Sequence, residues 1–297
     1  MTLDGAGDGE GHRFAEADDV ARLNYDFNLR ERCPDFQFHF DAWAEMAASF
    51  RDEWAELSRL DISYGPTPLE TFDLFLPGTP NPPVCIFFHP GSWQRLDKSL
   101  FSFIARPFTE RGCAAIFVNY PLVPTVRMGD IVDSVERCVR WIMGHAVELG
   151  VDGERLALFG HSAGGHLVTA LYARPWLFSA AESRRIRGVA CIGGFYDLDA
   201  VRRSFMNDAL ALTPADVEHL SPIASRDFMN CELVLAVGEN ETEEFHVQQD
   251  RMVAHLAACG RSVESLRLTG HDHFSLVRDL ALASNPMISR IVAMFAK

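Results

Sequence analysis

Short apolar runs recur along the chain and alternate with longer stretches whose apolar residues follow the period of a helix. The runs lack strict alternation of apolar and polar positions, which is typical of strands buried on both faces of a sheet. We predict such strands at residues 84–88, 114–118, 156–159, 189–192, 233–237 and 265–268, and an earlier strand at residues 71–76.

The helical stretches lie between these runs. The clearest covers residues 131–146, where one side carries the apolar residues Ile131, Val135, Val139, Ile142, Met143 and Ala146. Further helices are predicted at residues 163–173, 244–258 and 286–295, and an amphipathic helix at residues 35–60 precedes the first strand. Strands that alternate with helices predict an α/β fold with a mainly parallel central sheet and helices on both faces.

These elements predict a single α/β domain over residues 19–297, with a small helical arm at its N-terminal end. Residues 1–18 are acidic and glycine-rich, and we expect them to form a flexible tail. Residues 176–187 and 198–230 show no clear period and are expected to carry small lid-like insertions. Of the 297 residues, 48% are hydrophobic, which excludes disorder over most of the length.

Acidic residues outnumber basic ones, 41 Asp and Glu against 27 Lys and Arg, so the formal net charge is −14. This charge repels nucleic acid and anionic membrane surfaces, and no apolar run approaches the roughly 20 residues that span a bilayer. The acidic start does not resemble a signal peptide, and the seven widely spaced cysteines fit reduced core thiols. We therefore expect a cytoplasmic protein without a nucleic-acid or membrane partner.

The strongest local motif is Gly160-His-Ser-Ala-Gly164, between the predicted strand at 156–159 and the helix at 163–173. Its two glycines supply the small residues that a sharp strand-to-helix turn requires. Ser162 would lie at the N-terminus of the helix, where free N–H groups and the helix dipole favour an oxyanion. The pattern predicts Ser162 as a catalytic nucleophile, against the alternative of an inert serine in a glycine-rich turn.

A serine nucleophile needs a base, and in G-x-S-x-G enzymes the acid and then the base follow it in the chain. The base is His271 or His273, and we favour His273 because Phe274 and the following helix would orient its ring. Spacing favours Glu241 as the acid but leaves three neighbours open: Glu239, Glu243 and Glu244. The two histidines could form half a metal site, but no second pair at ligand spacing accompanies them, so we expect no metal.

The segment His89-Pro-Gly-Ser-Trp-Gln94 follows the predicted strand at 84–88. In many G-x-S-x-G hydrolases a small-residue loop at this place supplies oxyanion donors. Since Pro90 has no N–H, we assign the donors to three residues: Gly91, Ser92 and, after the nucleophile, Ala163. Trp93 and His161 are our candidates for contact with the substrate.

Four segments stand out in order and spacing: His89-Pro-Gly-Ser-Trp93, Gly160-His-Ser-Ala-Gly-Gly-His166, Gly238-Glu-Asn-Glu-Thr-Glu-Glu-Phe245 and His271-Asp-His-Phe274. Together they resemble the kynurenine formamidase (arylformamidase) branch of the α/β-hydrolases, which adjoins the hormone-sensitive-lipase-like esterases. Residues 97–102, 23–26 and 32–35 add to the likeness, which covers about residues 20–295. The resemblance implies an α/β-hydrolase fold, with Ser162 as nucleophile, Glu241 as acid and His273 as base.

Two positions depart from the family pattern. Pro90 stands where the family usually has glycine, and Ser92 stands where it usually has an aromatic residue. We expect the missing aromatic side chain to enlarge or repolarise the pocket and so to influence the choice of substrate.

The sequence as a whole predicts a cofactor-independent serine hydrolase for a small acyl amide or ester. The resemblance implies N-formylkynurenine as the leading substrate, cleaved to kynurenine and formate in tryptophan catabolism. A carboxylesterase for short acyl chains is the alternative enzyme, and a non-catalytic binding protein of this fold is the alternative from another class. Such binding proteins typically lack one triad member, whereas this chain has a candidate for each. A homodimer is compatible with the sequence.

Overall fold

The structure, a computed structural model, describes residues 8–296, with side chains from residue 18 onward. Its strands are β1 (Ser58–Ser63), β2 (Thr71–Phe75), β3 (Val84–Phe88), β4 (Ala114–Val118), β5 (Leu156–His161), β6 (Ile186–Ile192), β7 (Glu232–Gly238) and β8 (Glu264–Leu268). They form one sheet in the order β1-β2-β4-β3-β5-β6-β7-β8. The pairs β1–β2 and β2–β4 are antiparallel and the other neighbours are parallel. The predicted mainly parallel sheet is confirmed.

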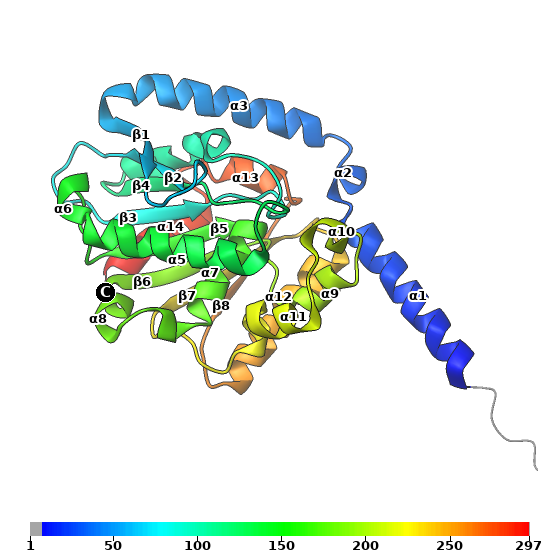
Figure 1. The fold of residues 1–297 in the computed structure, drawn as a ribbon. Coiled ribbons are helices and arrows are strands. Elements are labelled where there is room, and N and C mark those ends of the chain that lie inside the picture. Colours follow the sequence, from blue (N-terminus) through cyan, green and yellow to red (C-terminus); the bar gives the residue numbers. More distant parts are fainter. Residues whose placement is uncertain (1–7, 297) are drawn as a thin grey trace, which may run out of the picture.

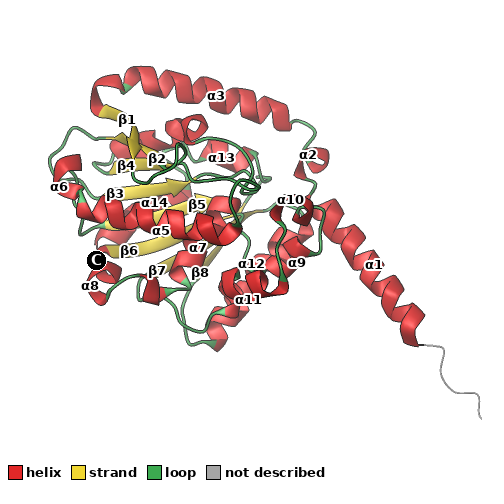
Figure 2. Cartoon of the chain, viewed as in Figure 1, coloured by secondary structure: helices red, strands yellow, loops and turns green. Residues whose placement is uncertain are grey.

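Two hydrophobic cores lie on the two faces of this sheet, and Figure 2 shows the strands enclosed by helices. Along β3, Val84, Ile86 and Phe88 face one core, whereas Cys85 and Phe87 face the other. The first core is covered by α5 (Met128–Gly144), α7 (Ala163–Tyr172) and α12 (Glu243–Ala258). The second is covered by α3 (Phe36–Glu53), α4 (Arg106–Thr109), α13 (Ser275–Asp279) and α14 (Pro286–Ala293).

The largest difference from the predicted elements concerns residues 35–60. Helix α3 ends at Glu53, and after a short 3-10 turn at Ala55–Leu57 the chain forms β1, which we did not predict. Most β1 residues are exposed, so the strand lacks the apolar run that identifies the buried strands. The apolar spacing of α3 also continues to Leu57, which extended the predicted helix too far.

The connections carry short helices. Helix α6 (Ala146–Leu149) follows α5, and α8 (Ala180–Arg185) lies in the segment that we expected to be irregular. The longer insertion holds α9 (Leu198–Arg202), α10 (Asn207–Leu210) and α11 (Pro214–Leu220). All seven cysteine thiols are free and five of them are buried, which agrees with the predicted core thiols. No helix among the described residues is both long and apolar enough to cross a membrane.

The N-terminal arm consists of α1 (Asp8–Phe27), α2 (Leu29–Arg32) and α3. In Figure 1, α1 projects away from the body of the molecule, whereas α3 runs along it. Residues 1–7 of the predicted tail lie outside the described residues, and α1 occupies the remainder of that segment. The flexibility of the tail and the division of the chain into a tail and one domain stay predictions.

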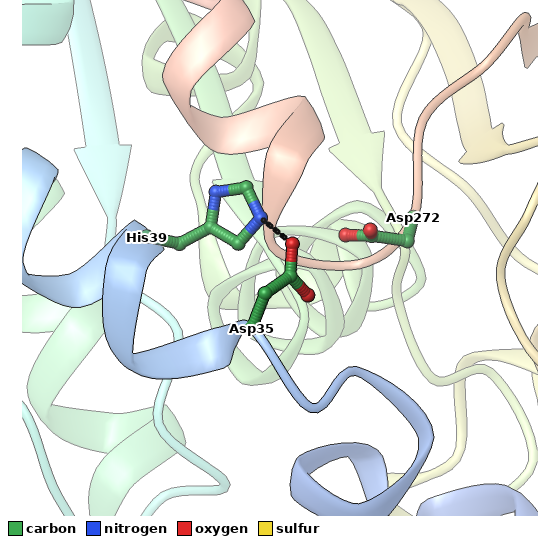
Figure 3. A group of neighbouring side chains, drawn as sticks. All are labelled: Asp35, His39 and Asp272. Carbon is green, nitrogen blue, oxygen red and sulfur yellow. Dashed lines mark ion pairs between the residues drawn. The ribbon is translucent and has the colours of Figure 1, made fainter.

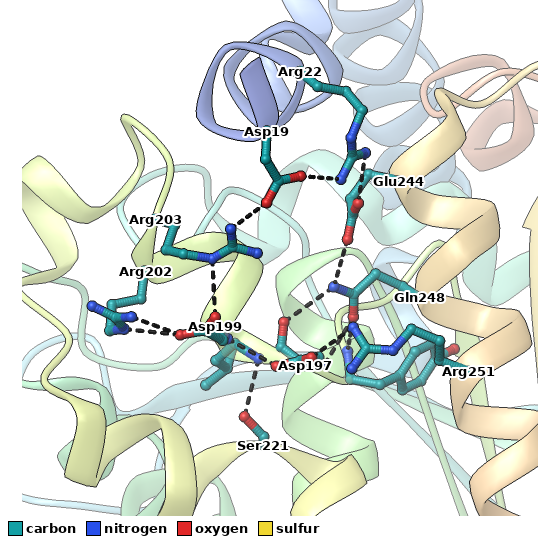
Figure 4. A network of polar contacts seen from close by, with 12 residues as sticks. Asp19, Arg22, Asp197, Asp199, Arg202, Arg203, Ser221, Glu244, Gln248 and Arg251 are labelled. Atoms are coloured by element: carbon teal, nitrogen blue, oxygen red, sulfur yellow. Dashed lines mark hydrogen bonds and ion pairs between the residues drawn. The ribbon is translucent and has the colours of Figure 1, made fainter. Parts of the chain in front are cut away.

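The last turns of α1 are fixed to the body by ion pairs, shown in Figure 4. Arg22 donates to Glu244 on α12 at 2.9 Å, and Arg203, which follows α9, pairs with Asp19. Apolar contacts accompany these pairs, because the ring of Phe27 packs against the rings of two buried residues, Phe195 and Phe245, at 5.5 and 6.0 Å. The arm therefore contacts the body at the end of the sheet where the parallel strands finish.

Candidate active site

Ser162 lies in the sharp turn between β5 and α7, with φ 54° and ψ −117°. A residue other than glycine rarely adopts positive φ, and residues strained in this way often belong to functional sites. Backbone hydrogen bonds hold the turn: the N–H of Ser162 donates to Ile192 at 2.9 Å, and the carbonyl of Ser162 accepts from His166 at 3.0 Å. The Ser162 side chain lines a cavity, and its hydroxyl forms no hydrogen bond with any residue that the structure describes.

Close backbone contacts explain the glycines of this turn. A Cβ atom on Gly164 would lie 1.9 Å from the carbonyl oxygen of Phe88 in β3. A Cβ atom on Gly160 would lie 2.3 Å from the carbonyl oxygen of Gly164. Both distances are far inside van der Waals contact, so the turn can form in this place only with glycine at both positions.

His273 lies in the loop between β8 and α13 and meets the carboxylate of Glu241. Nδ1 of His273 donates to Oε2 of Glu241 at 2.6 Å, and Oε1 of Glu241 accepts from the N–H of Gly238 at 3.0 Å. The two side chains are 3% and 0% exposed. The ring of Phe274 packs edge-on against the His273 ring at an interplanar angle of 89°. Because a carboxylate only accepts, the proton sits on Nδ1 and leaves Nε2 of a neutral His273 as an acceptor.

Ser162 and His273 line the same cavity. The structure contains no hydrogen bond between their side chains. Hydrogen bonds between a nucleophile and its base are often long in free enzymes and shorten when substrate binds. Both side chains face one cavity, and proton transfer from Ser162 to His273 requires this hydrogen bond to form.

The structure separates the other candidates for acid and base from this pair. His271 lies outside the cavity wall, with its Nε2 atom 3.5 Å from the carboxylate of Asp279. The three remaining acids have other surroundings: Glu239 accepts from a backbone N–H at 2.8 Å, Glu244 pairs with Arg22 at 2.9 Å, and Glu243 is exposed. Of the four acidic candidates, Glu241 alone contacts the ring of His273.

The loop after β3 adopts a left-handed backbone over three consecutive residues, Gly91, Ser92 and Trp93, with φ of 129°, 53° and 59°. The carbonyl of Gly91 accepts from the N–H groups of Gln94 and Arg95 at 3.0 and 3.1 Å, which closes the loop. A Cβ atom on Gly91 would lie 2.0 Å from the carbonyl oxygen of Arg95, so this position requires glycine. The N–H groups of Gly91, Ser92 and Ala163 donate to no described residue and are available to an oxyanion.

His89 supports this loop from the core. Its Nδ1 atom donates to the carbonyl of Pro90 at 2.6 Å, and its ring stacks on Tyr120 with centroids 4.4 Å apart. The hydroxyl of Tyr120 donates to the carbonyl of His89 at 2.7 Å. Burial lowers the pKa of His89 to about 4, so the ring is neutral at neutral pH.

The two predicted substrate contacts lie in different places. His161 lines the cavity, and its ring centroid is 4.5 Å from that of His273. Neither ring nitrogen of His161 has a partner among the described residues, and burial lowers the pKa of His161 well below its usual value. Trp93 is instead fully buried against His166 and Phe195 and does not line the cavity. The prediction for Trp93 needs correction, because the left-handed loop directs this side chain into the core.

The cavity has a volume of about 370 Å³ and combines apolar walls with a few polar groups, as small-molecule sites commonly do. Of the described residues, five phenylalanine and tryptophan side chains line it: Phe27, Phe40, Trp43, Phe205 and Phe274. Sequence reasoning missed most of this wall, because the N-terminal arm and the segment around α10 reach the cavity only in the folded chain. The charged residues Arg30, Arg95 and Asp208 were missed for the same reason, and no motif marks them.

Asp35, His39 and Asp272 form the group of described residues that could hold a metal ion, with ligand atoms within 4.8 Å of one another. Figure 3 shows the His39 ring beside the two carboxylates. Nε2 of His39 lies 3.5 Å from Asp35, and one oxygen of Asp272 already accepts from the N–H groups of Phe274 and Ser275. Asp35 and His39 lie at the start of α3, whereas Asp272 directly precedes His273. The group therefore joins α3 to the loop that carries His273.

Comparison with known proteins gives matches over most of the chain. A family model described as alpha/beta hydrolase fold matches residues 85–276. Kynurenine formamidases of Danio rerio and Drosophila melanogaster are 28% and 26% identical to this chain. These matches cover 80% and 67% of this chain, and 82% and 69% of the relatives. The resemblance predicted from the motifs is thereby confirmed.

Solved structures agree with the family match. A crystal structure of a proposed thioesterase from Silicibacter sp. superposes with a TM-score of 0.78 and 27% identity, covering 93% of this chain and 98% of that chain. Esterase B from Lactobacillus rhamnosis, with a TM-score of 0.68 and 20% identity, covers 94% of this chain and 97% of its own. At 20% identity, the likeness to esterase B shows a shared fold.

Proposed function

The chain belongs to the alpha/beta hydrolase fold family, and from this premise we propose that it is a cofactor-independent serine hydrolase for a small aryl amide with a formyl group. N-formylkynurenine is the leading candidate substrate, with kynurenine and formate as products. The observation that carries the proposal is the contact of His273 with Glu241 at 2.6 Å beside the cavity that Ser162 lines. The similarity to curated kynurenine formamidases supports the choice of substrate.

In the proposed mechanism Ser162 attacks the formyl carbonyl while Nε2 of His273 takes its proton. Glu241 keeps the Nδ1 proton of His273 in place and stabilises the imidazolium that forms. The N–H groups of Gly91, Ser92 and Ala163 bind the oxyanion of the tetrahedral intermediate, and one such donor typically contributes about 3 kcal/mol. His273 then returns the proton to the leaving arylamine. Water hydrolyses the formyl-serine ester by the same steps, which releases formate and restores Ser162.

The aromatic walls of the cavity suit the aryl part of such a substrate. Stacking and edge contacts between aromatic rings are each worth about 1 kcal/mol beyond the buried area. An arylamine is also a better leaving group than an alkylamine, so a site of the esterase kind is sufficient for an aryl formamide.

A carboxylesterase for short acyl chains is the second candidate. The same nucleophile, base and oxyanion donors serve for an ester, and an arylesterase of Saccharolobus solfataricus is 36% identical over 90 residues, or 29% of this chain. Ser92, which replaces the aromatic residue usual in the formamidase pattern, lines the cavity and leaves room there for a different acyl group.

We further propose a cytoplasmic protein without nucleic-acid or membrane partners, in agreement with its seven free thiols and its net charge of −14. A homodimer is compatible with this proposal.

The proposal is tested by hydrolysis of N-formylkynurenine and p-nitrophenyl acetate with purified wild type, Ser162→Ala and Ser284→Ala. Ser162→Ala should abolish turnover of both substrates without loss of the folded state, because it removes only the attacking oxygen. Ser284 is exposed and far along the chain from the motif, so Ser284→Ala should match wild type. Turnover by Ser162→Ala at more than a few per cent of wild type would contradict the assigned nucleophile. Hydrolysis of the ester alone would favour the esterase.

A further inference from the structure

Two arginines line the cavity that holds Ser162. Arg30 belongs to α2 of the N-terminal arm, and Arg95 belongs to the loop after β3 that carries the oxyanion donors. Figure 1 shows α2 between α3 and α1, on the side of the molecule toward which the parallel strands point. The two arginines therefore come from separate parts of the chain, line one cavity, and are both exposed to solvent.

Neither arginine side chain forms an ion pair or a hydrogen bond with a described residue. The Arg30 guanidinium lies 5.2 Å from the centre of the Phe36 ring, which is a cation–π contact and leaves its N–H groups free. Elsewhere on the same side of the molecule arginines are paired: Arg22, Arg202, Arg203 and Arg251 all contact carboxylates, as Figure 4 shows.

The positive charges of Arg30 and Arg95 also repel each other. Although Arg95 is exposed at the surface, desolvation of its guanidinium, followed by the positive charge of Arg30, lowers the pKa of Arg95. A pair of like charges is unfavourable until an anion lies between them or beside them. In a protein with a net charge of −14, the general field disfavours anionic ligands, so cations at the cavity supply the local attraction that such a ligand needs.

The rest of the lining leaves this positive charge largely unbalanced. Asp208, in α10, is the one carboxylate among the described residues that line the cavity, and it forms no ion pair with any residue that the structure describes. The remaining wall is aromatic, aliphatic or uncharged, apart from the histidines of the site.

We propose that Arg30 and Arg95 bind a carboxylate of the substrate, at the end remote from the bond that Ser162 attacks. Guanidinium groups bind carboxylates through two parallel N–H···O bonds, which fixes orientation as well as charge. The site then selects aryl amides or aryl esters that carry a carboxylate over neutral analogues of the same shape. This inference rests on the proposed function, because it assumes that Ser162 acts on an acyl aryl compound in this cavity.

The test uses two pairs of substrates that differ only in charge. The first pair is N-formylkynurenine and its α-carboxamide, and the second is 4-acetoxybenzoate and 4-acetoxybenzamide. The readout is the ratio of kcat/KM for the carboxylate over kcat/KM for the amide in wild type, Arg30→Gln, Arg95→Gln and the double variant. Arg226→Gln is the control, because Arg226 is exposed and outside the cavity wall.

We expect the ratio to fall on the order of tenfold in each single variant and further in the double variant, mainly through KM of the carboxylate substrate. Arg226→Gln should keep the wild-type ratio. Equal losses on the charged and neutral substrates, or an unchanged ratio in the double variant, would overturn the carboxylate site.

Failure of the proposed function gives a different result. If wild type cleaves the acetoxy pair but neither formyl compound, the formamidase assignment fails, and the acetoxy ratio alone decides whether the arginines select a carboxylate. If the formyl compounds are cleaved with a ratio that the arginine variants do not change, the formamidase assignment stands and the carboxylate site fails. If wild type cleaves none of the four compounds, both are overturned.

Discussion

Glu241 is the residue on which the assignment of the acid depends, because its carboxylate alone determines which nitrogen of His273 carries the proton. In Glu241→Gln the side-chain amide can donate to Nδ1, which leaves the proton on Nε2, where it prevents the ring from accepting from Ser162. Loss of a triad acid typically lowers kcat about 10⁴-fold. We expect a loss of several orders of magnitude in kcat, measured with the preferred substrate, and an unfolding temperature close to wild type.

Glu243→Gln is the matched control for this prediction, since Glu243 lies two residues away and is exposed. Its kcat should remain within a few-fold of wild type. Glu239→Gln and Glu244→Gln should also have small effects on kcat, although Glu244→Gln removes the charged partner of Arg22 on α12 and is expected to weaken the docking of the arm. A mild effect of Glu241→Gln beside a severe one at another position would reassign the acid.

Gly164 tests the backbone contacts of the nucleophile turn. In Gly164→Ala the new methyl group meets the carbonyl of Phe88 at 1.9 Å, so either β3 or the turn must move. We expect loss of soluble folded protein, or a decrease in the free energy of unfolding by more than about 3 kcal/mol, measured by urea denaturation. Gly129→Ala in α5 has open space around its Cβ position and should be neutral or stabilise by up to about 1 kcal/mol. Similar unfolding curves for the two variants would show that the turn is less tightly packed than its geometry indicates.

At the scale of the elements, a cluster of charged side chains joins β2, α3 and the segment that follows the loop after β3. Asp73 in β2 is fully buried and pairs with Arg51 of α3 and, at 3.1 Å, with Lys98. Lys98 is itself nearly buried and also contacts Asp61 at 2.6 Å. Removing one partner of a buried ion pair leaves an uncompensated charge, which commonly costs more than the pair contributes.

Asp73→Ala should therefore lower the free energy of unfolding by about 3–5 kcal/mol, measured by chemical denaturation. Asp250→Ala is the control, because Asp250 pairs with Arg267 on the surface and is 66% exposed. An exposed pair contributes at most about 1 kcal/mol, so this variant should resemble wild type. Equal effects of the two substitutions would mean that water reaches Asp73 and compensates its loss.

The elements that could be predicted from sequence are those whose residues are buried by the sheet itself. The apolar runs of β3, β4 and β7 follow directly from their burial on both faces, and their ranges agree with the prediction to within one residue at each end. β1 was missed because an exposed edge strand needs no apolar run. The cavity wall was missed because the position of Phe27 depends on contacts with residues far along the chain, which no local pattern records.

In the site too, some features could be predicted from local sequence and others depend on the folded chain. The chain order of Ser162, Glu241 and His273 follows from the topology of parallel strands, whose ends lie together, and could be predicted from motifs and resemblance. The direction of Trp93 could not, because it depends on a left-handed backbone at three consecutive residues. Arg30 and Arg95 could not either, since a missing ion pair is a property of the folded chain.

In the molecule as a whole, three buried histidines besides His273 lie around the turn that holds Ser162 and the loop after β3: His89, His161 and His166. Burial lowers the pKa of His89 and of His166 to about 4 and that of His161 well below its usual value. His166 still donates from Nε2 to the carbonyl of Leu220 at 3.0 Å, a bond that the neutral ring can form. The same burial that shapes the site therefore makes the folded state sensitive to acid.

The last prediction is a loss of stability between pH 7 and pH 5. The pKa of these histidines is about 6.5 in the unfolded chain and lower in the folded one, so the unfolded state binds more protons in this range. The stabilisation is fully present above pH 6.5 and is lost as the pH falls toward the folded pKa. For His89 and His166, each with a folded pKa of about 4, the loss reaches about 2 kcal/mol per residue at pH 5.

Urea denaturation at several pH values should show that His89→Gln and His166→Gln each reduce the slope of stability against pH, whatever their effect at pH 7. His219→Gln, at an exposed position, should leave the slope unchanged. Parallel curves for all three variants would mean that the acid sensitivity comes from other groups, because a residue that no longer titrates must remove its own share of the slope.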